Sequence, residues 1–135
     1  GVIFALGAMV ENALEAAEIL SAEKIQLEVW DARFCRPLDT GALADASRRH
    51  PFIATVEEHA LQGGFGAAVT EALADMGIVI PVSRHGVEDR FIQHASSREE
   101  QLQVCGLSSE ELANQWRERI FETRSQNKLE QEPSS

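Results

Sequence analysis

The chain alternates short apolar stretches with stripes of apolar residues at helical spacing. The apolar stretches lie at residues 2–6, 26–31, 52–56 and 78–82. Stretches this short, bounded by glycine, proline or charged residues, are typical of strands buried on both faces. Between and after them, apolar residues recur every three or four positions. This spacing predicts helices at residues 8–22, 39–48 and 65–76 and from residue 108 onward.

The first helix has a clear division between apolar and polar positions. We expect its buried stripe to consist of Val10, Ala13, Leu14, Ala17 and Leu20. The opposite face then carries Glu11, Asn12, Glu15 and Glu18.

The fourth strand is expected at an edge of the sheet. Pro81 lies inside the stretch 78–82 and has no N–H to donate to a neighbouring strand. The more polar residues that follow, 83–93, are predicted to be irregular.

Capping residues mark the helix ends. Asp39 is a good N-cap, and Leu38 and Leu43 stand at the spacing of a hydrophobic staple. Residues 96–99 and 108–111 have capping-box spacing, so each should open a helix. The second of these helices presents Leu112, Ala113, Trp116 and Ile120 on one face. Residues 123–135 lack a core face and are expected to form a polar tail.

The regular alternation of strand and helix predicts βαβ units, and therefore a parallel sheet with helices on both faces. In such folds, functional groups gather beyond the carboxyl ends of the strands. Those ends are expected at Gly7, at residues 31–33, at 57–59 and at 84–85. The polar residues there should share one edge of the molecule, which is either a ligand site or an interface.

Composition and charge narrow the classes of partner. The 135 residues carry a net charge of −10, which argues against nucleic acid or an anionic membrane surface as the main partner. No apolar run reaches the roughly 18–20 residues that span a bilayer. The two cysteines suggest neither a zinc site nor a disulfide framework, and a cytoplasmic location is expected. The first residue is Gly1, which we interpret as the start of a piece of a longer protein.

The densest group of chemically capable residues is the segment 55–69. Gly63, Gly64 and Gly66 precede a helix, whose first amides can hold an anion. The alternative is a tight turn that brings the helix close to the sheet. Glu57, Glu58 and His59 can supply a general base, or one carboxylate can cap a neighbouring helix while the other meets solvent or a partner. Adjacent strand residues point to opposite faces, so Glu57 and Glu58 are not expected to act as a pair.

Two further groups allow a functional or a structural reading. Arg33 and Arg36 can bind a phosphate, or form salt bridges to nearby carboxylates. The polar residues His85, Asp89, Arg90 and His94 have no known metal-ligand spacing, so loop hydrogen bonding is favoured. His50 is interpreted as a helix-end residue.

Together, residues 29–39, 55–69, 85–94 and 105–108 resemble, in their order and spacing, the C-terminal domain of the transketolase-like enzymes. Within that group they are most similar to the deoxyxylulose-phosphate synthases. The β subunit of 2-oxo-acid dehydrogenases and transketolase itself are the alternatives. The resemblance implies a domain at residues 1–122, followed by the polar tail.

The resemblance also implies an architecture. It is a three-layer α/β/α fold with a mainly parallel sheet of about four strands, in the order second, first, third, fourth. The family's domain begins with one more strand, antiparallel to the rest, which this sequence does not contain. The second strand is then left at an edge.

For function, the resemblance implies a part of an enzyme that uses thiamine diphosphate and a divalent metal, usually magnesium. The family's cofactor motif, Gly-Asp-Gly followed by Asn, does not occur here. No catalytic, cofactor or metal residue is therefore assigned, and the chain alone is expected to be inactive. Its expected partners are the preceding domains of the same enzyme and a second subunit in a homodimer.

A different class of function stays open, namely a non-catalytic module that binds a small anion. Its site would use Arg33, Arg36, His59 and the amides that follow Gly63.

Overall fold

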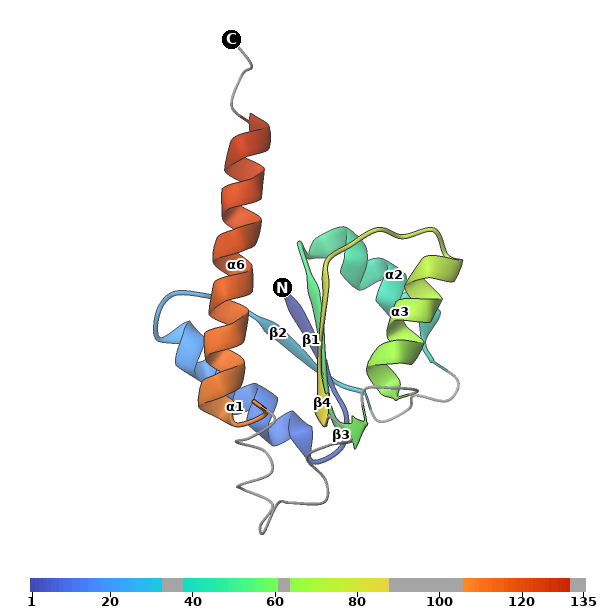
Figure 1. Ribbon diagram of the computed structural model, residues 1–135, viewed down its shortest axis with the longest axis horizontal. Coiled ribbons are helices and arrows are strands. Elements are labelled where there is room, and N and C mark those ends of the chain that lie inside the picture. The colour runs from blue at the N-terminus through green and yellow to red at the C-terminus, as the bar shows by residue number, and fades with distance from the viewer. Residues whose placement is uncertain (33–37, 61–63, 88–105, 132–135) are drawn as a thin grey trace.

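The structure is a computed structural model that describes residues 1–32, 38–60, 64–87 and 106–131, without the side chains of residues 59, 60, 87, 123 and 125–131. Strands and helices alternate along the chain (Figure 1). They are β1 (Val2–Ala5), α1 (Met9–Ser21), β2 (Glu28–Asp31), α2 (Thr40–Arg49), β3 (Ile53–Ala60), α3 (Phe65–Asp75), β4 (Val82–Val87) and α6 (Ser109–Gln131).

The described strands form one parallel sheet in the order β2-β1-β3-β4. This confirms the expected order and places β2 and β4 at the two edges. The strands begin in register, since Val2 pairs with Glu28 on one side and with Ile53 on the other. All four carboxyl ends therefore meet at one edge of the molecule.

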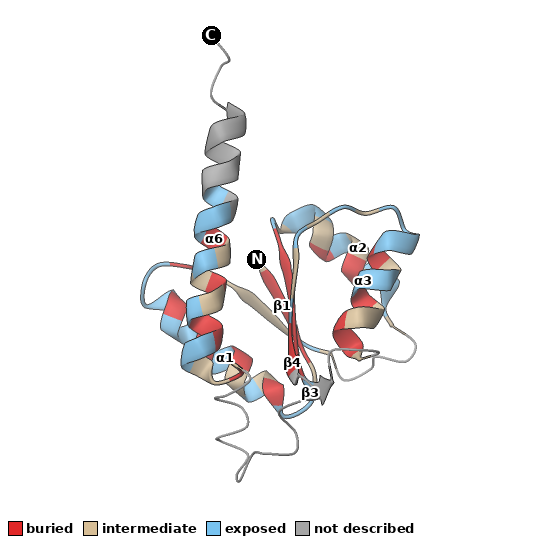
Figure 2. Ribbon diagram, viewed as in Figure 1, coloured by how far each residue is buried: buried red, intermediate tan, exposed pale blue. Residues whose placement is uncertain are grey.

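Two apolar clusters lie on the two faces of the sheet, which confirms the three-layer architecture (Figure 2). Alternation along each strand divides the residues between them. Ile3, Ala5 and Val56 face α1 and α6, and the buried Trp116 of α6 belongs to their cluster. Phe4 and the strand residues that point to the same side of the sheet face α2 and α3.

The buried face of α1 is rotated from the predicted stripe. Its buried residues are Met9, Ala13, Ala16 and Leu20, whereas Leu14 is 52% exposed. The cause is α6, which packs along one flank of α1. Asn12, expected on the polar face, donates from Nδ2 to the Leu107 carbonyl at 3.1 Å. The spacing of apolar residues within α1 cannot show that a second helix covers one of its flanks.

The start and the buried face of α6 agree with the prediction. Ser108 Oγ accepts a hydrogen bond from the Glu111 amide, and the predicted stripe of Leu112, Ala113, Trp116 and Ile120 is buried. The helix continues to Gln131, so part of the segment expected as a tail has a helical backbone. The domain limit at residue 122 stays a prediction. The helix expected from residue 96 lies outside the described residues.

The position of the fourth strand was predicted wrongly. It was expected at residues 78–82, but β4 occupies Val82–Val87, so it shares only Val82 with the predicted strand and otherwise lies in the segment expected to be irregular. Gly77, at φ +71°, ends α3, and the chain then crosses back to the amino edge of the sheet with Val79 fully exposed. The Ile53 amide donates to the Pro81 carbonyl at 3.0 Å, which fixes where pairing begins. Pro81 thus precedes the edge strand.

The beginning of α2 agrees with the prediction. Asp39 Oδ1 accepts from the Ala42 amide at 3.0 Å, as expected of an N-cap. Leu38 and Leu43 pack in the same apolar cluster, as a staple requires. Among the described residues, no helix is both long and apolar enough to cross a membrane.

Candidate functional site

Glu57 connects the carboxyl end of β3 to the start of α3. The strand continues through the acidic segment to Ala60, and Glu57 is fully buried on the α3 face. Its Oε1 accepts from the Phe65 amide at 2.9 Å, and its Oε2 accepts from the Gly66 amide at 2.6 Å. The carboxylate therefore satisfies two of the helix amides that have no partner within the helix, at its positive end.

These hydrogen bonds bear on two chemical interpretations of residues 55–69, an anion site at the helix amides and a general base at Glu57. The amides of Phe65 and Gly66, which were candidates for an outside anion, are already bonded to Glu57. Both oxygens of Glu57 are engaged, so the carboxylate has the capping role that the sequence allowed as an alternative to a general base.

The neighbouring candidates do not join Glu57. Glu58 is exposed, and its side chain points to the opposite face of β3. His59 has a strand backbone, but its side chain lies outside the described residues. Arg33, Arg36 and Gly63 also lie outside them, so their placement remains a prediction.

Gly66 allows α3 to lie close to the sheet. A Cβ atom at this position would stand 2.6 Å from Thr55 Oγ1 and 3.2 Å from Glu57 Oε2. Any side chain would push the helix away from β3 and disturb the cap. The predicted close approach of helix and sheet is confirmed at Gly66. Gly64 is the N-cap residue and has an extended backbone.

A second buried polar contact joins β4 to α6. His85 is 8% exposed, and its Nε2 accepts from Trp116 Nε1 at 3.0 Å. The two rings meet edge to face with centroids 5.9 Å apart. Burial lowers the pKa of His85 to about 4, against the opposing effect of a hydrogen bond with Gln115 and with a small further lowering by Arg119. The neutral imidazole is thus a structural acceptor.

Sequence reasoning missed this pair because it placed His85 in a loop. The available signal was a tryptophan on the buried stripe of α6, since a buried indole N–H needs an acceptor. Asp89, Arg90 and His94, grouped with His85 from the sequence, lie outside the described residues. The described part of the chain contains no group of three His, Cys, Asp or Glu residues suited to a metal.

A third polar cluster lies at the opposite, amino edge of the sheet. Glu28 accepts from Trp30 Nε1 at 2.6 Å, contacts His50 Nε2 at 2.8 Å and accepts from Arg49 at 3.2 Å. These hydrogen bonds lower the pKa of Glu28 to about 2. His50 directly follows α2, which confirms its helix-end position. The cluster links the end of α2 to the edge strand β2.

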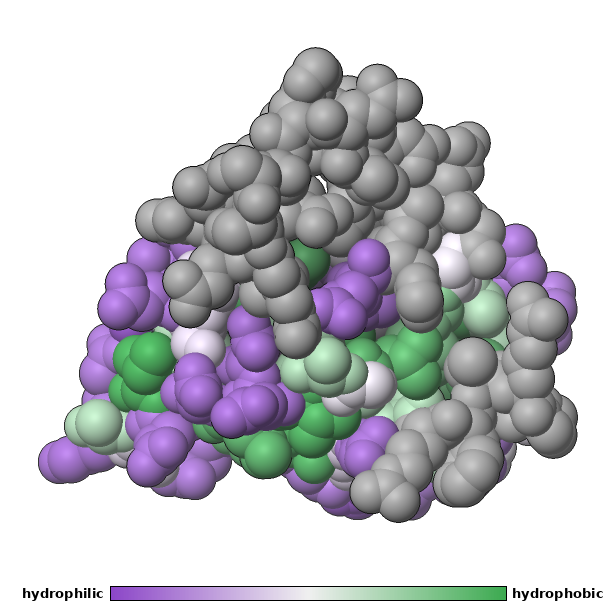
Figure 3. Space-filling model, turned by 90° about the horizontal axis from the view of Figure 1, so that it is seen from below, coloured by the Kyte–Doolittle hydropathy of each residue, from purple (hydrophilic) through white to green (hydrophobic). Residues whose placement is uncertain are grey.

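The carboxyl edge also has an apolar hollow of about 160 Å³ between the sheet and α2. It is lined by Phe4, Trp30, Asp31, Ala32, Leu38, Asp39, Ala42, Leu43 and Phe65. Figure 3 looks at this edge and shows apolar surface among polar residues. Among the described residues of this lining, the acid or base groups are the carboxylates of Asp31 and Asp39. The described lining is mainly apolar and is therefore suited to packing against an apolar surface.

Residues 2–122 match the protein family described as "Transketolase, C-terminal domain". Among the curated relatives is a 1-deoxy-D-xylulose-5-phosphate synthase of Thermomicrobium roseum, 47% identical over 83% of this chain. Synthases of the same name from Gloeobacter violaceus and Crocosphaera subtropica are 44% and 41% identical, each over 87% of the chain. The chain spans only about 18% of the length of these relatives.

A solved structure described as "Split gene transketolase, inactive beta4 tetramer" has a similar fold. The TM-score is 0.76 at 36% sequence identity, and the match covers 84% of this chain and 36% of that one. The sequence match and the fold match thus point to the same family.

Proposed function

The chain belongs to the transketolase C-terminal domain family, and on that premise we propose that it is the C-terminal domain of a 1-deoxy-D-xylulose-5-phosphate synthase. The observation that carries this proposal is the set of synthases 41–47% identical over most of the chain. The chain corresponds to about 18% of their length, so the rest of such an enzyme would consist of other domains.

The proposed complete enzyme condenses pyruvate with glyceraldehyde 3-phosphate and releases carbon dioxide. It is a transferase of the pathway to isoprenoid precursors. Thiamine diphosphate and magnesium, which the family resemblance implies, would supply the carbon chemistry. The described residues of this chain do not fit that cofactor. The helix amides best suited to a diphosphate are bonded to Glu57, and no metal-binding group is present among the described side chains.

The role proposed for this chain is therefore structural. The buried cap at Glu57 and the close contact at Gly66 hold the start of α3 against the carboxyl end of β3. The apolar hollow at the carboxyl edge gives the preceding domains of the same enzyme a surface to pack on. A homodimer is part of the proposal. A cytoplasmic location is also part of it, in line with the low cysteine content.

The test is an assay of the complete product of the gene that encodes this chain. With thiamine diphosphate and magnesium, it should convert pyruvate and glyceraldehyde 3-phosphate to 1-deoxyxylulose 5-phosphate. Transfer of a two-carbon unit between sugar phosphates would instead identify a transketolase. Decarboxylation of a 2-oxo acid that needs a separate α subunit would identify a dehydrogenase β subunit. Either result would replace the proposed activity and leave the family unchanged.

A further inference from the structure

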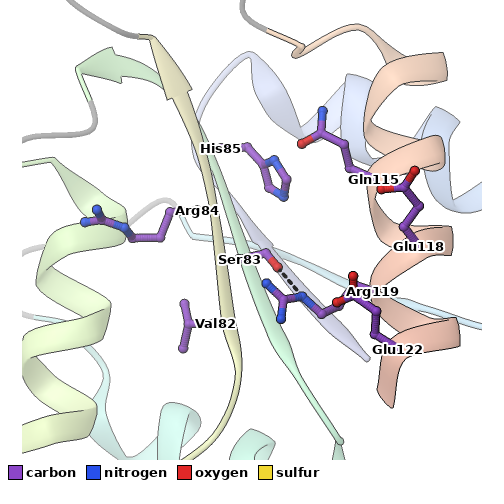
Figure 4. A pocket seen from close by; sticks show the side chains of 8 residues that line it. All are labelled: Val82, Ser83, Arg84, His85, Gln115, Glu118, Arg119 and Glu122. Atoms are coloured by element: carbon purple, nitrogen blue, oxygen red, sulfur yellow. Dashed lines mark hydrogen bonds between the residues drawn. The ribbon is translucent and has the colours of Figure 1, made fainter. Parts of the chain in front are cut away.

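A polar groove of about 340 Å³ lies between β4 and α6 (Figure 4). Arg119 Nε donates to Ser83 Oγ across it at 3.0 Å, and Glu118 and Glu122 stand on the same helix as Arg119. Charges of both signs thus share one wall, so the groove favours no single class of ligand. The apolar hollow beside α2 differs, because one of its walls, Trp30, has a polar partner outside the hollow.

Trp30 takes part in two features of the fold at once. It is one wall of the hollow of about 160 Å³ between the sheet and α2. Its indole N–H donates to Glu28 Oε1 at 2.6 Å. Glu28 and Trp30 are two positions apart on β2, so their side chains lie on the same face of the sheet, about 7 Å apart along the strand. Trp30 therefore links the Glu28 carboxylate to the hollow.

The orientation of the Glu28 carboxylate is fixed by the end of α2. Its Oε2 accepts from Arg49 Nη1 at 3.2 Å and lies 2.8 Å from His50 Nε2. The other oxygen, Oε1, faces the indole of Trp30. An ionised acceptor makes a stronger hydrogen bond than a neutral one, so this carboxylate is suited to fix the direction of the ring.

The remaining contacts of the Trp30 ring are apolar. It meets the Phe4 ring edge to face, with centroids 5.6 Å apart and an interplanar angle of 64°. Trp30 is half-buried on an edge strand, and no described strand covers its outer side. The hydrogen bond to Glu28 is therefore the directional contact that sets where the indole points.

The hollow has room for an aromatic ring. An apolar cavity of about 150 Å³ lined by leucine, isoleucine and phenylalanine holds benzene or xenon. The hollow is of similar size, and its walls include Leu38, Leu43 and Phe65. The six-membered ring of Trp30 has the size of benzene and already stands at this wall. An indole released from Glu28 would bury apolar surface by turning inward.

We propose that Glu28 is a positioning residue that holds the Trp30 indole at the wall of the hollow and keeps the hollow open, and that a released indole turns inward and closes it. The consequence for function rests on the proposed packing of the preceding domains on this hollow. A closed hollow lacks the space that those domains would fill, so docking favours the outward position of the indole.

Xenon is the probe of the open hollow, followed by methyl NMR of the 135-residue chain. In the unsubstituted chain, xenon should shift the methyl resonances of Leu38 and Leu43. In Glu28→Ala the apparent xenon affinity should fall about tenfold, because a lost hydrogen bond to a charged group moves the ring equilibrium by that factor or more. Overhauser contacts between the Trp30 ring and Phe65 should grow stronger in this variant.

Two further variants separate the hold on the ring from the attachment of α2. Glu28→Gln keeps an oxygen acceptor for the indole and should retain most of the xenon binding. Arg49→Gln combined with His50→Gln removes partners of Glu28 on α2 but keeps Glu28 and Trp30. It should therefore bind xenon more tightly than Glu28→Ala. If Glu28→Ala does not fold, Glu28→Val replaces it, since valine is a better strand former.

The link to docking is tested by thermal unfolding of the complete gene product. The melting temperatures of Glu28→Ala and Glu28→Gln should differ more there than in the isolated chain. Equal differences in the two proteins would overturn the link to docking. Xenon affinity unchanged in Glu28→Ala, loss in the Arg49 and His50 variant as large as in Glu28→Ala, or no xenon binding by the unsubstituted chain would overturn the positioning role. None of these measurements depends on pyruvate turnover, so the synthase activity is decided separately by its own assay.

Discussion

The helices α3 and α6 lie on opposite faces of the sheet, and each is joined to a strand by a different kind of buried polar contact. At the start of α3, the Glu57 carboxylate takes two backbone amides, and Gly66 brings the helix against the sheet. At α6, a neutral side-chain pair, His85 and Trp116, makes the contact. The first contact leaves no space for even one Cβ, whereas beside the second a groove of about 340 Å³ remains.

The difference follows from which atoms make each bond. The Phe65 and Gly66 amides reach the Glu57 carboxylate because α3 lies close to β3, and this close approach leaves no space for a Cβ at Gly66. At the other contact, the rings of His85 and Trp116 lie between β4 and α6, and their size keeps the helix away from the strand. The α3 corner is thus suited to define a rigid edge, and the α6 side is suited to leave a surface open.

The largest effect is expected from Glu57→Gln. The amide oxygen can accept one hydrogen bond, but the NH₂ group would face the second helix amide, donor against donor. One hydrogen bond is lost, a donor is left facing a donor, and the remaining hydrogen bond loses its charged acceptor, so unfolding in urea should show a loss of about 3 kcal/mol. Glu58→Gln, one residue away and exposed, should change stability by less than about 0.5 kcal/mol. Similar losses for both variants would contradict the assigned cap.

The α6 contact should respond to pH. His85 has a folded pKa of about 4, below its ordinary value of 6.5. Its contribution is fully present above about pH 6.5 and is lost as the pH falls through that value toward 4, because the unfolded chain binds the proton more tightly. Between pH 7 and pH 5 the loss is about 2 kcal/mol. His85→Gln should remove this part of the pH dependence in urea titrations, and an unchanged profile would show that His85 is not its source.

Two glycine substitutions compare close contact with open space. Gly66→Ala should destabilise by about 2 kcal/mol, because the new methyl group would contact Thr55 Oγ1 at 2.6 Å. Gly41→Ala in α2 meets only Asp39 Oδ1 at 3.4 Å and should be neutral or stabilising by up to about 1 kcal/mol. Melting temperatures that move in opposite directions would support the close approach of α3. A neutral Gly66→Ala would contradict it.

Much of the fold was predictable because its signals are local. Apolar runs, Asp39 as a cap and the stripe around Trp116 each depend on residues close in sequence. The errors arose where tertiary contacts decide the outcome. The face of α1 depends on α6, and the start of β4 depends on pairing with Ile53 rather than on hydrophobicity. Exposed Val79 shows that an apolar residue can lie outside every strand.

The candidate site was predictable only as a set of alternatives. Alternation along β3 correctly separated Glu57 from Glu58. Nothing in the local pattern showed that Glu57 would reach the Phe65 and Gly66 amides, since that contact depends on how far α3 returns toward the sheet. The pairing of His85 with Trp116 joins residues 31 positions apart and required the fold.

The most direct test of the proposed structural role is calorimetric titration of thiamine diphosphate with magnesium into two proteins, the 135-residue chain and the complete gene product. The account predicts saturable binding to the complete enzyme, together with turnover of pyruvate. It predicts no binding heat and no turnover for the chain alone, in a sample whose circular dichroism spectrum is that of a folded protein. Saturable binding of the cofactor to the isolated chain would contradict the account.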